Sequence, residues 1–177
     1  MSANLFRDLR HFIEESRSLA PPRPDRRAGA AEVFTPTDLV IEMLQYLDLG
    51  LMAPGQTVLD PACGDGQFLV AAKGVKVLHF GMSDEEALVD IFGIDIFRDN
   101  VDTCTARLGG GTILMGDSLS PERRLAGQSE LEWRQLQALM PTRLEKRPKV
   151  RPAAGSRQMT HPESMPPGQA SLFDKEI

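Results

Sequence analysis

Long apolar runs, a cysteine framework and a large charge of one sign are all missing from this sequence of 177 residues. No stretch is apolar for long enough to cross a bilayer, and Arg7, Asp8 and Arg10 stand where a signal peptide would be apolar. These absences exclude a membrane protein and predict a soluble, cytoplasmic one. The length and the 41% share of hydrophobic residues predict one compact domain with a real core.

Cysteine is represented by two residues only, Cys63 and Cys104, and they lack CxxC or Cys/His spacing. This pattern predicts neither a metal site nor a disulfide framework, and we expect both to be small buried side chains. The net charge of -5 disfavours a surface coated uniformly with basic residues for nucleic-acid binding. DNA binding would therefore depend on a local basic patch.

Helical and strand periodicities alternate along the chain. The first helix, over residues 4–19, is amphipathic and is expected to pack on the body. A second helix begins at Thr37 or Asp38, because Pro36 suits a helix start. The other predicted elements are strands over 57–59, 91–96 and 112–115, and helices over 67–73, 83–90, 100–108 and 129–140. This alternation predicts an α/β fold with a parallel sheet and flanking helices.

Local sequence signals support several of these predicted helices and indicate which of their side chains face inward. The pairs Ser83/Glu86 and Ser129/Glu132 have the spacing of capping boxes. The side chains predicted to face inward are Leu39, Val40, Met43, Leu44 and Leu47 in the second helix, and Leu131, Leu136 and Leu139 in the last.

The turn over residues 60–68 reads D-P-A-C-G-D-G-Q-F and follows the first strand, where open parallel sheets bind ligands. Gly64 and Gly66 allow the backbone to approach a ligand, and the N-terminus of the next helix can receive a carboxylate. An ammonium group can be held by Asp60 or Asp65, so the turn suits a zwitterionic amino-acid moiety. The third glycine of a dinucleotide fingerprint is missing, which disfavours a nicotinamide cofactor. A purely structural glycine turn is the alternative.

This turn resembles motif I of the N6-adenine DNA methyltransferases, D-P-x-C-G-x-G-x-F, and the resemblance implies that it binds S-adenosylmethionine. The implied cofactor contacts in the turn are Asp60, Pro61, Cys63, Gly64, Gly66 and Phe68. Upstream, Phe34, Thr35 and Pro36 resemble the F-T-P element, which helps to enclose the methionine end of the cofactor. The implied fold is a partial Rossmann-like methyltransferase domain over residues 32–140.

Two downstream segments extend the resemblance. Gly93-Ile94-Asp95-Ile96 is similar to motif II, which implies that Asp95 accepts the ribose hydroxyls and that Ile96 covers an adenine face. The sequence separation between the first turn and Asp95 is longer than the ~20 residues of a dinucleotide-binding unit, and an extra helix before residue 91 accounts for the difference. Gly116-Asp117-Ser118 resembles motif III, with Asp117 and Ser118 near the adenine amine. A loop cap is the alternative role for Asp117.

The catalytic motif of these methyltransferases, [DNS]-P-P-[YFW], is not found in this sequence, because Pro166-Pro167 is followed by Gly168 rather than by an aromatic residue. We therefore predict no catalytic residue within this chain. The fourth strand that would pair with the first is also missing, which leaves that sheet edge bare. The N-terminal segment, the helix after Ser129, a second copy or a partner chain could cover the edge. We favour covering in trans by another polypeptide, which could carry the catalytic motif.

The sequence divides into residues 1–31, a helix and a Pro/Arg-rich loop, the domain at 32–140, and a Pro-rich basic tail at 141–177. In the tail, Gln169, Leu172 and Phe173 resemble the anchors of the Q-x-x-L-F peptide that docks into bacterial sliding clamps; a frayed or back-packed end is the alternative. Basic side chains that could hold DNA phosphate, or could simply be solvated, are Arg143, Lys146, Arg147, Lys149 and Arg151.

Two functions remain open on the sequence alone. The first is a split or truncated DNA adenine methylase, of which this chain is the part that binds S-adenosylmethionine. The second is a catalytically inactive, methylase-like binding module that its C-terminal peptide recruits to the sliding clamp.

Overall fold

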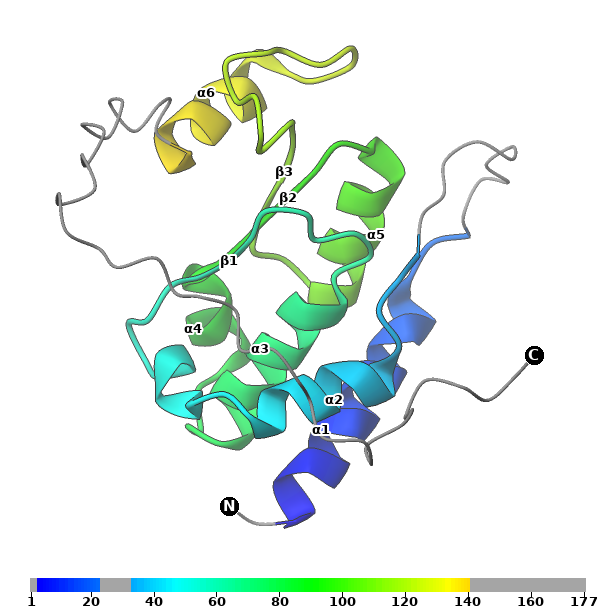
Figure 1. Cartoon of the computed structure of the whole chain (residues 1–177), viewed down its shortest axis with the longest axis vertical. Helices are drawn as coiled ribbons and strands as arrows, with labels where there is room; N and C mark the ends of the chain where they lie inside the picture. The colour runs from blue at the N-terminus through cyan, green and yellow to red at the C-terminus, as the bar shows by residue number, and fades with distance from the viewer. Residues whose placement is uncertain (1–2, 23–32, 141–177) are drawn as a thin grey trace, which may run out of the picture. The chain divides into compact units, whose positions relative to one another are not determined.

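The computed structural model describes residues 3–22 and 33–140, so the predictions for residues 23–32 and 141–177 lie outside the described residues. At its centre is a sheet of three parallel strands in the order β1-β2-β3 (Figure 1). These strands are β1 (Val58–Asp60), β2 (Ile91–Asp95) and β3 (Thr112–Met115). All three lie where the apolar pattern predicted them.

Helices flank the sheet and confirm the predicted α/β fold. They are α1 (Ala3–Ser16), α2 (Thr37–Gln45), α3 (Gln67–Leu78), α4 (Asp84–Val89), α5 (Arg98–Leu108) and α6 (Glu130–Leu139), with 3₁₀ turns η1 (Arg17–Leu19) and η2 (Leu49–Met52). Both predicted capping boxes are complete, since the hydroxyls of Ser83 and Ser129 accept from the backbone N–H groups of Glu86 and Glu132, whose carboxylates accept in return.

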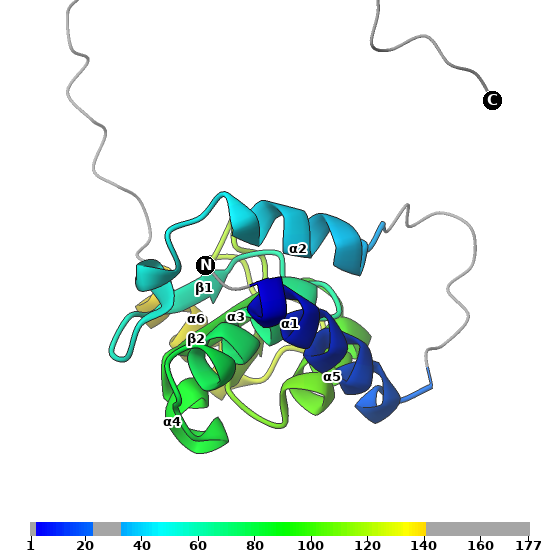
Figure 2. The same ribbon diagram turned by 90° about the horizontal axis from the view of Figure 1, so that it is seen from below.

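The main core lies between the sheet and the helices α3 and α5, and α1 and α2 pack on α3 (Figure 2). Leu9 and Ile13 of α1 are fully buried there, which confirms that the N-terminal helix packs on the body. The approach to α3 is close: a Cβ at Gly74 would lie 2.7 Å from Leu9 Cδ2 and 3.1 Å from Phe12 Cδ1. Side chains of the N-terminal helix therefore pack closely against the backbone of α3 at Gly74.

Two of the predicted inward faces are partly wrong. In α2, Val40 and Leu44 are buried as predicted, but Leu39 and Met43 are each 45% exposed. The buried residues of α2 are Thr37, Val40, Ile41 and Leu44, so the face that packs on α1 and α3 is rotated relative to the predicted one. Leu47, which follows the end of α2, and Leu131 of α6 are also exposed, whereas Leu136 is buried as predicted.

The opposite face of the sheet is covered by α6 alone among the described helices, through contacts of Leu136 with Ile94 and Leu114. Beside this contact lies a hollow of about 330 Å³, lined by Phe92, Thr112, Leu114, Gln135, Ala138 and Leu139. Within the described residues β1 pairs only with β2, and Leu59 on β1 is 36% exposed. The edge expected to be bare is therefore unpaired in this part of the chain.

The α6 helix is attached to α5 by a bidentate ion pair, in which Arg98 donates to both carboxylate oxygens of Glu132 at 2.7 and 2.8 Å. The Glu132→Gln variant is expected to lose about 1–2 kcal/mol of unfolding free energy at neutral pH. Hydrogen bonds from Arg98, and also from Ser129, lower the pKa of Glu132 to about 2. The stabilisation is therefore complete above the ordinary pKa of 4.5 and is lost as the pH falls towards 2.

Urea unfolding at several pH values measures this effect. The gap between the wild type and Glu132→Gln should close between pH 4.5 and pH 2. Glu130→Gln is the matched control, because Glu130 is 48% exposed and its partners Arg124 and Arg134 are 48% and 73% exposed, and a change below about 0.5 kcal/mol is expected. A gap that persists at the lowest pH would contradict the prediction.

Candidate functional site

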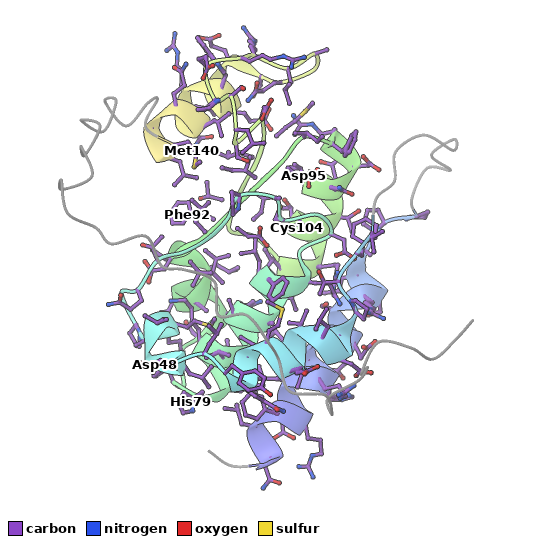
Figure 3. The ribbon with its side chains drawn as sticks, in the orientation of Figure 1. Asp48, His79, Phe92, Asp95, Cys104 and Met140 are labelled. Carbon is purple, nitrogen blue, oxygen red and sulfur yellow. The ribbon has the colours of Figure 1, made fainter. Side chains whose placement is uncertain are left out.

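The three segments singled out as motifs meet at the carboxyl edge of the sheet. The loop after β1 is held to β2, because Cys63 N donates to Ile94 O at 2.9 Å. The residue after β3 is held to the end of β2, because Gly116 N donates to Asp95 O at 2.8 Å. This edge is where ligands bind in open parallel sheets. Figure 3 labels Asp95 at the end of β2 and Cys104 on the neighbouring α5.

The loop depends on two glycines in the left-handed region, Gly64 (φ +53°) and Gly66 (φ +86°). A Cβ at Gly64 would lie 3.3 Å from the ring of Phe34, and one at Gly66 would lie 2.6 Å from Cys104 Sγ. Close packing of Gly66 onto α5 is therefore a second reason for glycine, beside the ligand approach expected from the sequence. As the N-cap of α3, Gly66 also lacks a side chain to satisfy the first N–H groups of that helix.

Asp95 joins the loop to the end of β2 and is only 8% exposed. Its Oδ2 accepts from Gly64 N at 3.0 Å, and its Oδ1 accepts from Phe97 N at 2.9 Å and Asn100 Nδ2 at 3.1 Å. The next residue, Ile96, is 50% exposed at the same edge. One carboxylate thus fixes the geometry of both segments.

The two acidic residues of the loop differ in their surroundings. Asp65 Oδ2 lies 2.8 Å from Arg107 Nη1, so its charge is already balanced. Asp60 Oδ1 accepts from Ala62 N at 3.0 Å. Burial raises the pKa of Asp60, and the charge of Asp95 raises it further. A cation near Asp60 would weaken the repulsion between the Asp60 and Asp95 carboxylates, and the predicted ammonium contact of Asp60 stays a prediction.

The cysteines are buried, as expected, at 5% exposure for Cys63 and 0% for Cys104. A hydrogen bond with Cys104 and burial both raise the pKa of the Cys63 thiol far above its usual range. These effects favour the neutral thiol of Cys63 over the nucleophilic thiolate.

The F-T-P element lies over the beginning of α3. Besides the contact of Phe34 with the loop, Thr35 O accepts from Gln67 Nε2 at 3.1 Å, and Pro36 is the N-cap of α2. Three motif residues, Asp60, Pro61 and Phe68, line a hollow of about 240 Å³ together with Val58 and Leu59 of β1. Their predicted contact with a cofactor stays a prediction.

At the end of β3, the half-buried residues Asp117 and Ser118 continue the same edge. Asp117 Oδ1 accepts from the backbone N–H groups of Leu119 at 3.0 Å and Ser120 at 3.2 Å. The loop-cap alternative is thus realised by one carboxylate oxygen. A cap of this kind leaves the second oxygen of a carboxylate able to accept another donor.

One residue next to the loop had no role assigned from the sequence. Arg107 of α5 is 3% exposed and contacts Asp65, Gln67 and Ser16. The signal that could have marked it is an arginine three residues after Cys104, on the buried face of its helix. The residues predicted to bind the sliding clamp, Gln169, Leu172 and Phe173, and the basic run after residue 142 lie outside the described residues.

Comparison with known proteins covers about the same segment as these motifs. Residues 24–110 match the family model described as N-6 DNA Methylase. The match includes the F-T-P element, the loop after β1, all of β2 and all of α5, and it ends before β3. No solved structure matches the chain. Within residues 3–22 and 33–140, no helix combines the length and the apolar character that a membrane span needs. Residues 24–110 therefore belong to the N-6 DNA methylase family.

Proposed function

We propose that this domain binds S-adenosylmethionine and serves as the cofactor-binding part of a DNA adenine methylase. The observation that carries the proposal is the convergence of the loop after β1, the end of β2 and the end of β3 on Asp95. The family match over residues 24–110 supports the class of reaction. When bound, the cofactor would supply an activated methyl group.

The chemistry of the available groups fits the parts of this cofactor. The uncapped N-terminus of α3 suits the methionine carboxylate, and Asp60 suits the ammonium group. Asp95 and the exposed Ile96 suit the ribose and an adenine face, with Asp117 beside them for the adenine amine. An acidic, partly buried site for the ammonium is consistent with the raised pKa of Asp60.

For methyl transfer, we propose that a separate polypeptide supplies the motif that accepts the target base. The free side of β1 supports this proposal, since within the described residues the strand pairs only with β2. The hollow of about 240 Å³ beside it is lined largely by apolar side chains, as expected of a surface that receives another element. A second copy of this chain is the other occupant that the experiment below can detect.

Isothermal titration of S-adenosylmethionine into the purified full chain tests the cofactor proposal, with NAD as the control ligand. We expect binding of S-adenosylmethionine, no binding of NAD at equal concentration, and no methyl transfer to adenine-containing DNA by this chain alone. Transfer by the chain alone would overturn the split arrangement but keep the cofactor site. Absence of binding would overturn the cofactor site itself. Sedimentation of the same sample distinguishes a second copy from a different partner.

A second proposal rests on the sequence Q-A-S-L-F near the C-terminus, and it makes the chain a module carried on the replication sliding clamp. Leu172 and Phe173 would fill the apolar groove of the clamp, while Gln169 sets the register. Immobilised bacterial clamp should retain the wild type and lose the Leu172→Ala, Phe173→Ala double variant. Equal retention of both forms would remove this proposal and leave the cofactor site unaffected.

A further inference from the structure

The guanidinium of Arg107 is enclosed between α1, α3 and α5, with 1% of its side chain exposed. Its Nη1 donates to Asp65 O at 2.9 Å and lies 2.8 Å from Asp65 Oδ2. An arginine is rarely buried to this extent, and it stays charged, so each of its contacts replaces lost hydration. One side of this guanidinium therefore holds the backbone and the side chain of the loop after β1.

The other side of the guanidinium reaches the end of α1 and the first residue of α3. Arg107 Nε and Nη2 each donate to Ser16 Oγ at 3.2 Å, and Nη2 also donates to Gln67 Oε1. The hydroxyl of Ser16 is oriented in turn, because it donates to Ile13 O at 2.7 Å. The cation on α5 thus connects the end of α1 with residues 65–67, two segments that are far apart in the sequence.

The network continues to the F-T-P element. Gln67 Nε2 donates to Thr35 O at 3.1 Å and to Thr37 Oγ1 at 3.3 Å. The same hydroxyl accepts from Arg17 Nη2 at 2.8 Å, directly after α1. The loop after β1 and the F-T-P element, which face each other where Phe34 meets Gly64, are therefore both tied to the end of α1.

We infer that Arg107 is a positioning residue for the cofactor site and that α1, which precedes the matched segment 24–110, is a working part of that site through Ser16. The inference rests on the proposed binding of S-adenosylmethionine. A loop with two left-handed glycines is costly to order, at about 1–2 kcal/mol per residue. Contacts that order such a loop in advance leave less of that cost to be met by ligand binding.

A buried cation with a purely structural role would behave differently, and Lys73 allows this comparison with Arg107. Lys73 of α3 borders the same hollow of about 460 Å³ as Ser16 and Arg107. It is 6% exposed, donates to Leu108 O at 2.8 Å and pairs with Asp84. These partners lie outside the loop and outside the F-T-P element. Loss of Lys73 should therefore lower stability without changing the loop.

The test combines four variants of the full chain: Ser16→Ala, Arg107→Lys, Arg107→Met and, as the control, Lys73→Met. The measurements are the dissociation constant of S-adenosylmethionine by titration, urea unfolding, and hydrogen exchange of the peptide covering residues 61–68. We expect affinity to fall about tenfold or more in Arg107→Met and about threefold in Ser16→Ala, with faster exchange in the loop. Arg107→Lys should recover part of the loss, because it keeps the charge.

Lys73→Met should lose stability but keep its affinity within about twofold and its loop exchange unchanged. If all variants lose affinity in proportion to their unfolding free energy, or if none loses affinity, the positioning role is overturned while the cofactor site stands. If the wild type itself does not bind S-adenosylmethionine, the proposed function is overturned together with this role. Should Arg107→Met fail to fold, Ser16→Ala and Arg107→Lys decide the question by the same measurements.

Discussion

Replacing Gly66 with alanine is expected to lower the free energy of unfolding by about 3 kcal/mol. Two costs add up at this position. The backbone has φ +86°, which disfavours any residue with a Cβ, and the new Cβ would lie 2.6 Å from Cys104 Sγ and 3.3 Å from Cys104 Cα. Because the Cα belongs to the backbone of α5, the clash cannot be relieved by a rotamer change alone. The loop would shift, and we expect S-adenosylmethionine affinity to fall at least about tenfold with it.

Gly55→Ala separates the two costs. Gly55 has a similar φ of +78°, but a Cβ there would meet nothing within 4 Å. Its expected loss is only about 1 kcal/mol, from backbone conformation alone. Urea unfolding of both variants gives the difference that is due to contact with α5. A Cys104→Ala background should restore part of the loss in Gly66→Ala, and equal losses at Gly55 and Gly66 would contradict the close-packing explanation.

The elements that the sequence predicted correctly are those with local causes. The capping boxes at Ser83 and Ser129 combine a hydroxyl and a carboxylate three residues apart, and both formed as the spacing required. The strand over residues 112–115 follows three glycines, and β3 has these bounds. Such signals need no knowledge of the partners that an element will contact.

The side chains that were misplaced depend on those partners. Whether Leu39 or Ile41 of α2 is buried is decided by the side on which α1 and α3 approach, and Ile41 is 4% exposed while Leu39 is 45% exposed. The apolar pattern of a short helix fits both arrangements. Periodicity therefore predicted the helix but not the direction of its buried face.

The candidate site divides in the same way. The motifs predicted that Asp95 and Asp117 lie at one edge of the sheet, and they do, because the carboxyl ends of neighbouring parallel strands meet at the same edge. The sequence did not distinguish the surroundings of Asp60 and Asp65, the two candidates for the proposed ammonium contact, since the pairing of Asp65 with Arg107 spans 42 residues of chain. Contacts of this range are set by packing of α5 against the loop, and no local pattern encodes them.

Asp95→Asn is expected to weaken S-adenosylmethionine binding about 100-fold. The carboxylate accepts from three donors, Gly64 N, Phe97 N and Asn100 Nδ2, across both of its oxygens. An amide of the same shape has one acceptor oxygen, so its NH₂ group must face at least one of these donors. The variant also loses one of the two carboxylate oxygens, and with it the negative charge, that would accept hydrogen bonds from the ribose hydroxyls. Titration of S-adenosylmethionine into both proteins measures the combined effect.

Part of this loss would come from the loop itself, so the control must change charge without touching it. Asp48→Asn does so, because Asp48 accepts from Gly50 N at 2.9 Å as the N-cap of η2, and Figure 3 labels it on a different part of the molecule from Asp95. The control should keep its affinity within about twofold. If Asp48→Asn and Asp95→Asn weakened binding equally, net charge rather than the Asp95 contacts would govern affinity. If Asp95→Asn bound like the wild type while its loop exchanged faster, Asp95 would order the loop without touching the cofactor, and the ribose would have to bind elsewhere along the edge.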